Sequence, residues 1–192
     1  MNLINYELWH ERYDGRLDHE KLLGVYSTRE KAEQAQASLR NKPGFSDHSD
    51  GFDIRRGKMD GTAWTYGGFA TIYPGEELQD PSPAPYPKIT EEQVYIPSVE
   101  PMPLTYWVLW MRFIDKWDDP HQLIVGVYTS RENAERGIGL VCEQPGFRDH
   151  PDGFVIEEGI IDQTAMPNGF VTIRDNDGRE HDEPIPDAAP AR

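Results

Sequence analysis

The chain is poor in cysteine and in positive charge. Its 192 residues include one cysteine, Cys142, which cannot form an internal disulfide bond or a zinc site built from several thiolates. Lys and Arg number 19 against 34 Asp and Glu, so the formal net charge is −15. This balance disfavours direct nucleic-acid binding, which needs a basic surface. It favours a protein partner with a basic surface, because opposite charges speed encounter.

Targeting and membrane-spanning signals are also missing. The N-terminal residues, MNLINYELWHERYDG, have no basic start followed by an apolar stretch, and therefore do not resemble a signal peptide. No apolar run approaches the ~18 residues that a membrane span needs. The sequence therefore predicts a cytoplasmic protein that makes no membrane contact.

Sequence motifs of nucleophilic, nucleotide-binding and zinc-dependent enzymes do not occur. The chain contains no GxSxG, Walker loop, HExxH or GxGxxG. Cys142 follows apolar residues near the expected end of a helix, so we expect it to be buried and inert. We assign no catalytic residue and no cofactor, and we favour a protein without enzymatic activity.

A long stretch of the sequence is present twice. Residues Gly24 to Phe52 read GVYSTREKAEQAQASLRNKPGFSDHSDGF, and Gly126 to Phe154 read GVYTSRENAERGIGLVCEQPGFRDHPDGF. The copies lie 102 positions apart without a gap. The similarity extends to the N-terminal side, where Leu8-Trp9 matches Leu109-Trp110 and one extra residue precedes the second GVY. The pattern indicates an internal duplication.

Each repeat has the signals of strands around one helix. Ser27 with Glu30, and Thr129 with Glu132, have the spacing of a capping box, which predicts helix starts at these positions. Alternating or β-branched stretches predict strands at 6–13, 21–26, 52–58 and 68–73 in the first repeat. The first two strands have counterparts in the second repeat, and the last two correspond to 154–161 and 169–174. The predicted fold is α+β, with two tandem, pseudo-symmetric β-β-α-β-β lobes, each a small antiparallel sheet with one helix.

Proline-rich stretches suggest the boundaries of the lobes. Residues 74–103 contain eight prolines and several acidic residues, which favours an extended, semi-rigid connection. We place the first repeat lobe at 1–73, the linker at 74–104, the second repeat lobe at 105–174, and an acidic, proline-rich tail at 175–192.

The duplicated DHxD loops are candidates for chemistry. A histidine between carboxylates could bind a metal ion or act as a general base. Aspartates in tight loops also cap backbone N–H groups, and in that interpretation Asp47 and Asp149 accept such bonds while Phe45, Phe52, Phe147 and Phe154 are buried. We favour the structural interpretation, because a folding element is copied with its repeat. The alternative metal ligands are Asp47, His48, Asp50, Asp149, His150 and Asp152.

Tryptophans near acidic residues are candidates for partner contacts. Trp117 lies in the sequence DKWDD, where apolar area and steering charge occur together. The equivalent turn of the first repeat has Leu17 where an aromatic anchor would be expected. The predicted partner-binding residues are Asp115, Trp117, Asp118, Asp119 and Trp64.

The motifs quoted above resemble a family of small uncharacterised bacterial domains. These domains share a strand ending in GVY, a capped helix with an EKAE-like start, and a PGFxDHPDGF loop, in which Ser49 here replaces proline. The resemblance implies no activity. In charge and composition the chain is also similar to immunity proteins of bacterial toxin systems. We expect an immunity protein or a comparable inhibitor; the alternatives are a metal-dependent enzyme using the DHxD loops and a structural or accessory protein.

Overall fold

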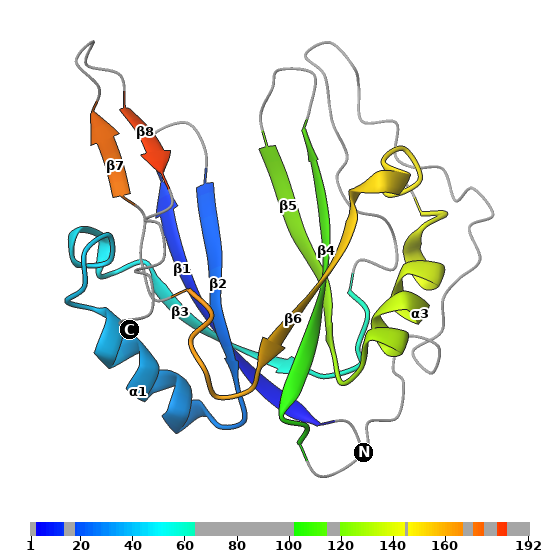
Figure 1. Ribbon diagram of the computed structural model, residues 1–192, viewed down its shortest axis with the longest axis horizontal. Coiled ribbons are helices and arrows are strands. Elements are labelled where there is room, and N and C mark those ends of the chain that lie inside the picture. The colour runs from blue at the N-terminus through cyan, green and yellow to red at the C-terminus, as the bar shows by residue number, and fades with distance from the viewer. Residues whose placement is uncertain are drawn as a thin grey trace, which may run out of the picture. The chain divides into compact units, whose positions relative to one another are not determined.

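The structure is a computed structural model that describes residues 3–13, 18–63, 102–114, 120–144, 146–166, 171–174 and 180–183. The described chain forms two three-stranded antiparallel sheets, each with one helix against it (Figure 1). This confirms the predicted α+β class with two similar lobes. Within the described residues, no helix combines the length and apolar character that crossing a membrane requires.

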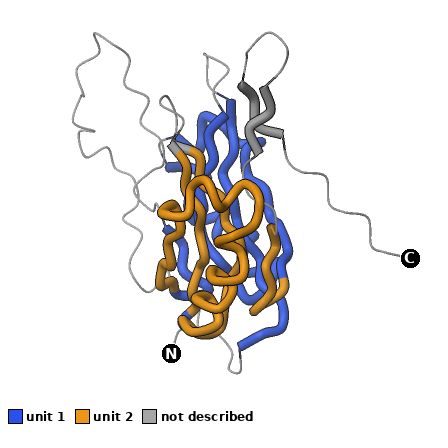
Figure 2. Tube along the Cα trace, turned by 90° about the vertical axis from the view of Figure 1, so that its left-hand side faces the viewer, with its two compact units in different colours: residues 1–4, 58–159 blue, residues 5–57, 160–192 orange. Residues whose placement is uncertain are grey.

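The residue ranges of the two compact units do not coincide with those of the two sequence repeats. Unit 1 contains residues 1–4 and 58–159, and unit 2 contains residues 5–57 and 160–192 (Figure 2). The chain leaves unit 2 at Gly57 and leaves unit 1 at Gly159. Each unit is therefore built from both repeats, whereas the sequence predicted contiguous lobes.

Unit 2 holds the sheet of the first repeat. Its strand order is β2-β1-β3, and β1 pairs with β2 in antiparallel fashion. Helix α1 packs against β2, and the short 3₁₀ helix η1 follows it. The elements are β1 (Ile4–Tyr13), β2 (Asp18–Tyr26), α1 (Arg29–Leu39), η1 (Ser46–His48) and β3 (Phe52–Lys58).

Unit 1 holds the corresponding sheet of the second repeat, in the order β5-β4-β6. Helix α3 packs against β4 and β5. The elements are β4 (Thr105–Ile114), β5 (Pro120–Tyr128), α3 (Arg131–Val141), η2 (Pro151–Gly153) and β6 (Phe154–Ile160).

The fourth strand predicted for each repeat has a different outcome in each. Residues 68–73 lie outside the described residues. The counterpart, β7 (Val171–Arg174), forms a two-stranded antiparallel sheet with β8 (Glu180–Glu183), which lies in the stretch assigned to the acidic tail.

Both first hairpins contain the same irregularity. In β1–β2 the register shifts between Leu8 and Trp9, and in β4–β5 it shifts between Leu109 and Trp110. The shift leaves Leu23 and Val125 without a partner in the register, and both side chains are fully buried. A β-bulge redirects one side chain in this way. The duplication therefore preserved a feature that fills each core.

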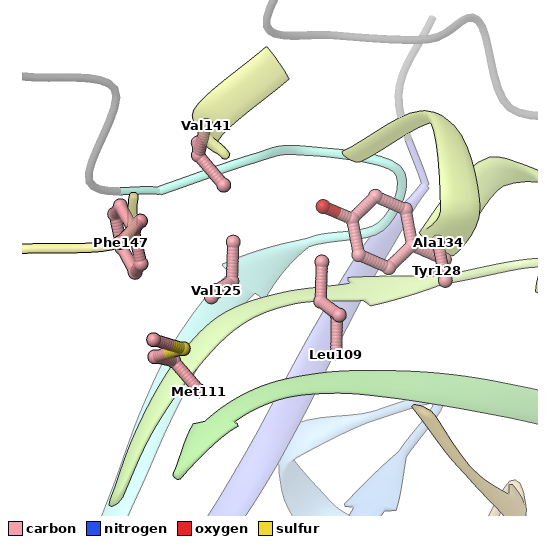
Figure 3. Packing of buried hydrophobic residues seen from close by; sticks show 7 residues of the cluster. All are labelled: Leu109, Met111, Val125, Tyr128, Ala134, Val141 and Phe147. Carbon is pink, nitrogen blue, oxygen red and sulfur yellow. The ribbon is translucent and has the colours of Figure 1, made fainter. Parts of the chain in front are cut away.

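Each helix covers its sheet with a face of small and aliphatic residues. Ala32 and Leu39 of α1 are buried, and Ala134, Gly137 and Val141 of α3 are buried. Among these, burial of the Leu39 or Val141 side chain contributes about 1.5–3 kcal/mol. Figure 3 shows the core of unit 1 between α3 and its sheet, formed by Leu109, Met111, Val125, Tyr128, Ala134, Val141 and Phe147. The core of unit 2 consists of Leu8, Leu23, Tyr26, Ala32, Leu39 and Phe45.

The capping prediction was wrong by one residue in both helices. The N-cap of α1 is Thr28, whose hydroxyl accepts from the backbone N–H of Lys31 at 3.3 Å. The N-cap of α3 is Ser130, which accepts from the N–H of Asn133 at 3.1 Å. Ser27 and Thr129 lie one residue earlier, and their hydroxyls bind distant aspartates instead.

Candidate functional site

The two DHxD loops are closed by backbone hydrogen bonds. In unit 2, the N–H of His48 donates to Phe45 O at 3.1 Å, and that of Gly51 donates to His48 O at 3.0 Å. Unit 1 repeats the pattern at His150 (3.0 Å) and Gly153 (2.9 Å). Gly44 and Gly146 open the loops with φ values of 78° and 82°, which glycine adopts readily.

The aspartates of these loops do not have the predicted capping role. Asp47 is exposed and accepts from Ser46 Oγ at 3.2 Å, and Asp149 lies 3.6 Å from Arg148 Nε. Among the described hydrogen bonds, none runs from a backbone N–H to either carboxylate. The backbone closes the loops by itself. The phenylalanine prediction is confirmed for Phe45 and Phe147, which are fully buried, whereas Phe52 and Phe154 are only partly buried against the cores.

A buried histidine in unit 2 fixes the loop, and the sequence did not reveal it. His10 of β1 is fully buried, and its Nε2 lies 2.8 Å from the carbonyl oxygen of His48. Its ring contacts Phe45 and Phe52 at centroid distances of 4.9 and 4.7 Å. Burial lowers the pKa of His10, although the His48 carbonyl opposes that shift. In unit 1 the same strand position holds Met111, so this histidine is specific to the first repeat.

In unit 1, the DHxD loop packs against the end of the β4–β5 hairpin instead. The ring of His150 stacks on Phe113, with centroids 4.2 Å apart and an interplanar angle of 16°. His121 of β5 also stacks on Phe113, at 4.9 Å and 18°. The structure therefore brings His150 next to Phe113, two residues before Asp115.

The predicted partner-binding residues themselves lie outside the described residues: Asp115, Trp117, Asp118, Asp119 and Trp64. The residues that flank the acidic turn are described. Ile114 ends β4, pairs with Pro120 of β5, and keeps 67% of its surface exposed. In the first repeat, Tyr13 pairs with Asp18, so the corresponding connection is residues 14–17 rather than 115–119. The extra residue of the second repeat is thus located in the acidic turn.

The metal hypothesis gains no geometric support from the loops. No group of three or more His, Cys, Asp or Glu side chains is arranged as metal ligands within the described ranges. Asp50 and Asp152 are exposed. Cys142 is only partly buried, with Sγ 4.0 Å from Gly139 O, so the expectation of a fully buried thiol was wrong. It is the C-cap residue that follows α3, and its backbone N–H donates to Ile138 O.

Each sheet also carries an arginine over a tryptophan, supplied by different strands. In unit 2, the Arg55 guanidinium of β3 lies 4.6 Å from the Trp9 ring centroid and pairs with Glu11, Glu20 and Asp53. Burial alone would lower the pKa of Arg55, but these carboxylates raise it. In unit 1, Arg112 of β4 lies 4.9 Å from the Trp110 centroid and binds Glu157 of β6 through two hydrogen bonds of 2.7 and 3.2 Å. The ion pair is reversed between the repeats, while the cation–π contact is kept.

A second duplicated motif lies beyond the third strand of each repeat. Residues 60–63 read DGTA and residues 162–165 read DQTA, also 102 positions apart. We call these the DxTA segments. Each binds the strand and helix of the other repeat. The matched spacing of these segments is a signal in the sequence that could have identified them.

The first DxTA segment belongs to unit 1. The backbone N–H of Asp60 donates to Val127 O at 2.8 Å, and that of Ala63 donates to Val125 O at 2.7 Å. The Asp60 carboxylate is buried and accepts from the N–H of Thr129 at 2.8 Å and from Asn133 Nδ2 at 3.0 Å.

The second DxTA segment makes the matching bonds in unit 2. The backbone N–H of Asp162 donates to Val25 O at 2.9 Å, and that of Ala165 donates to Leu23 O at 2.7 Å. The Asp162 carboxylate accepts from the N–H of Ser27 at 2.8 Å and from Lys31 Nζ at 2.6 Å.

The glycine of each GVY sequence is explained by these segments. A Cβ on Gly24 would lie 2.6 Å from the carbonyl oxygen of Gln163, and a Cβ on Gly126 would collide with the carbonyl oxygen of Gly61. Glycine allows this close approach of two backbones. Gly24 and Gly126 thus mark the contact positions of the DxTA segments in the sequence.

Comparison of the chain with protein-family models, with curated proteins and with solved structures gives no match. The described geometry therefore defines the class, an α+β protein with two similar lobes, and the resemblance drawn from the GVY and PGFxDHPDGF motifs stays a prediction.

Proposed function

We propose that this chain is a non-enzymatic binding protein that engages a partner with a basic surface through the end of the β4–β5 hairpin. The observation that carries the proposal is Ile114, a large apolar side chain that is 67% exposed immediately before the acidic turn 115–119. An exposed apolar residue beside a tryptophan and three carboxylates has the composition of an interface anchor with a charged rim.

Contacts within unit 1 support this location. The ring of Phe113 in β4 stacks on His121 of β5 and on His150 of the DHxD loop, and these contacts hold the end of the hairpin against the loop. A surface held rigid before binding loses less entropy when the complex forms. Asp149 and Asp152 of the same loop are exposed and add negative charge. A basic partner would therefore encounter both steering charge and apolar area.

The first repeat offers a comparison within the chain. Its hairpin has Arg12 where Phe113 stands and Tyr13 where Ile114 stands, and its turn lacks the added residue. We infer that the second hairpin diverged for contact while the first retained a scaffold role. Among binding proteins, an immunity protein or inhibitor of a bacterial toxin fits the acidic charge, and a cytoplasmic location fits the single cysteine.

The test is co-expression of this chain with the product of the neighbouring gene. If a complex forms, the gene product is immobilised, and the association and dissociation rates of this chain are measured on it. Trp117→Ala should raise the dissociation rate roughly thirtyfold, because loss of a hot-spot anchor costs about 2 kcal/mol of binding free energy. Asp118→Asn with Asp119→Asn should slow association and flatten its salt dependence, because steering is screened by ions.

The matched control replaces residues 14–17 of the first hairpin with Gly and Ser, which should leave the affinity unchanged. Replacement of residues 115–119 in the same way should abolish binding. Equal binding by both replacements would eliminate the proposed site. Substrate turnover that disappears in His48→Ala or His150→Ala would eliminate the binding-protein proposal as a whole.

A further inference from the structure

The docking of the DxTA segments is reciprocal. The first repeat supplies Asp60 to unit 1, whose strand β5 and helix α3 come from the second repeat. The second repeat supplies Asp162 to unit 2, whose strand β2 and helix α1 come from the first repeat. Each unit therefore lacks part of its structure unless the other repeat provides it (Figure 2).

The docking surface has the same three parts in both units. The first part is the outer strand of the sheet, where the carbonyl oxygens of β2 or β5 accept N–H groups from the segment. Edge strands bind added segments in this way, because their hydrogen-bonding groups are unused by the sheet. The second is the GVY glycine, over which the segment passes.

The third part is the residue before the helix N-cap, together with the third residue of the helix. Asp60 accepts from Thr129 and Asn133, and Asp162 accepts from Ser27 and Lys31. A carboxylate at this end of a helix is favoured by the helix dipole and by the N–H groups exposed there. The strand edge and the helix end thus recognise one occupant together.

A side-chain hydrogen bond between the repeats completes each contact. Thr62 Oγ1 lies 2.9 Å from the Tyr128 hydroxyl, and Thr164 Oγ1 lies 3.0 Å from the Tyr26 hydroxyl. The aspartates reach their positions with φ values of 57° and 65°, the left-handed region that Asp and Asn tolerate better than most residues. The Asp, Thr and Ala positions of the motif therefore make equivalent bonds twice.

From this reciprocity we propose that the chain is a fused dimer of repeats: each repeat carries a docking surface whose occupant is the DxTA segment of another repeat. The covalent connection between the repeats is not what holds them together. Two repeats on separate polypeptides bind each other through the same contacts, and the partner that fits this surface is a second copy of the repeat.

The experiment uses the full chain with a protease recognition sequence placed between residues 74 and 103, cleaved after folding. The cleaved protein should elute as one species of intact size in native size-exclusion chromatography, and it should separate into two fragments only in denaturant. Fragments that elute separately under native conditions would overturn the proposal.

Substitutions test whether the DxTA segments carry the association. Asp60→Gly with Asp162→Gly removes both carboxylates without straining the positive φ, and it should raise the dissociation constant of the fragments by at least about tenfold. Asp60→Asn with Asp162→Asn keeps one acceptor at each site and should give an intermediate value, which also serves if the glycine variant folds poorly.

The control is Asp47→Gly with Asp149→Gly, which alters two exposed carboxylates at matched positions of the repeats. It introduces the same two glycines, with the same entropic cost in the unfolded chain. The control should leave the association of the fragments unchanged. A glycine variant of Asp60 and Asp162 that associates as tightly as this control would show that the segments do not hold the repeats together.

Discussion

Among single residues, Tyr26 and Tyr128 occupy equivalent buried positions in the two repeats. Each ends the second strand of its repeat and is buried. Burial raises the pKa of both phenols, although the hydroxyls of Thr164 and Thr62 oppose the shift. The pKa of Tyr128 rises to about 12. These phenols therefore stay neutral in the folded protein at pH values where an exposed tyrosine ionises.

This shift predicts a loss of stability in alkaline solution. The pKa of Tyr128 is higher in the folded chain than the value of 10.0 expected after unfolding, so its contribution is present below pH 10 and is lost as pH rises toward 12. The free energy of unfolding should fall across that window, by about 3 kcal/mol from this residue.

The measurement is urea unfolding at several pH values, combined with an absorbance titration of tyrosinate. Tyr128→Phe should flatten the pH dependence more than Tyr26→Phe does. If both variants keep the full alkaline dependence of the parent chain, the assignment of the shift to these residues is wrong.

At the scale of elements, the two helices start in the same way but are held by different chemistry. In unit 2, the third helical residue is Lys31, which forms an ion pair with Asp162. In unit 1 the equivalent residue is Asn133, whose uncharged amide donates a hydrogen bond to the Asp60 carboxylate. Burial alone would raise the pKa of Asp162, but hydrogen bonds from Lys31 and Ser27 hold the pKa below its usual value. The stability that Asp162 contributes is therefore lost as pH falls through that lowered pKa.

We expect salt to affect the two helix contacts differently. Lys31 and Asp162 are 48% and 29% exposed, so their ion pair is screened and contributes about 0.2–1 kcal/mol at low salt. The destabilisation caused by Asp162→Asn should therefore shrink at high salt, whereas that caused by Asp60→Asn should not. Urea unfolding at low and high sodium chloride measures both.

Lys31→Asn provides the matched variant, because it gives unit 2 the residue that unit 1 has at this position. In that background, Asp162→Asn should lose its salt dependence. An equal salt dependence of Asp60→Asn and Asp162→Asn in the parent chain would contradict the distinction between the two contacts.

The elements that local sequence determines were predicted well. Alternating and β-branched stretches predicted the first three strands of the first repeat. The helix start was predicted one residue early, because the capping-box spacing at Ser27 and Glu30 is also compatible with Thr28 as the cap. The hydroxyl of Ser27 instead donates to Asp162, a residue 135 positions away. Local sequence spacing carries no information about so distant a contact.

At the scale of the whole molecule, the composition of the two units could not be predicted from the repeats alone. A duplicated sequence is equally compatible with two self-contained lobes and with an exchange of segments, since the same contacts form in either arrangement. The second DHxD loop illustrates the same limit, because His150 and Phe113 are distant in sequence and stack through packing. The net charge of −15 favours a partner with a basic surface, and this stays a prediction.

Each unit is completed by the DxTA segment of the other repeat, and amide hydrogen exchange on the intact chain gives a direct test of this exchange of segments. Asp60→Gly should lower the free energy of local opening at the start of α3 by about 2 kcal/mol, because donors there lose a charged acceptor. It should speed exchange at the start of α3, where the N–H of Thr129 is bonded to Asp60, and leave α1 unchanged.

Asp162→Gly should give the mirror result, with faster exchange at Ser27 and the start of α1 and no change in α3. We expect this crossed pattern, in which a substitution in one repeat loosens the helix of the other. Faster exchange of α1 in Asp60→Gly, and of α3 in Asp162→Gly, would contradict it, because each segment would then stabilise its own repeat.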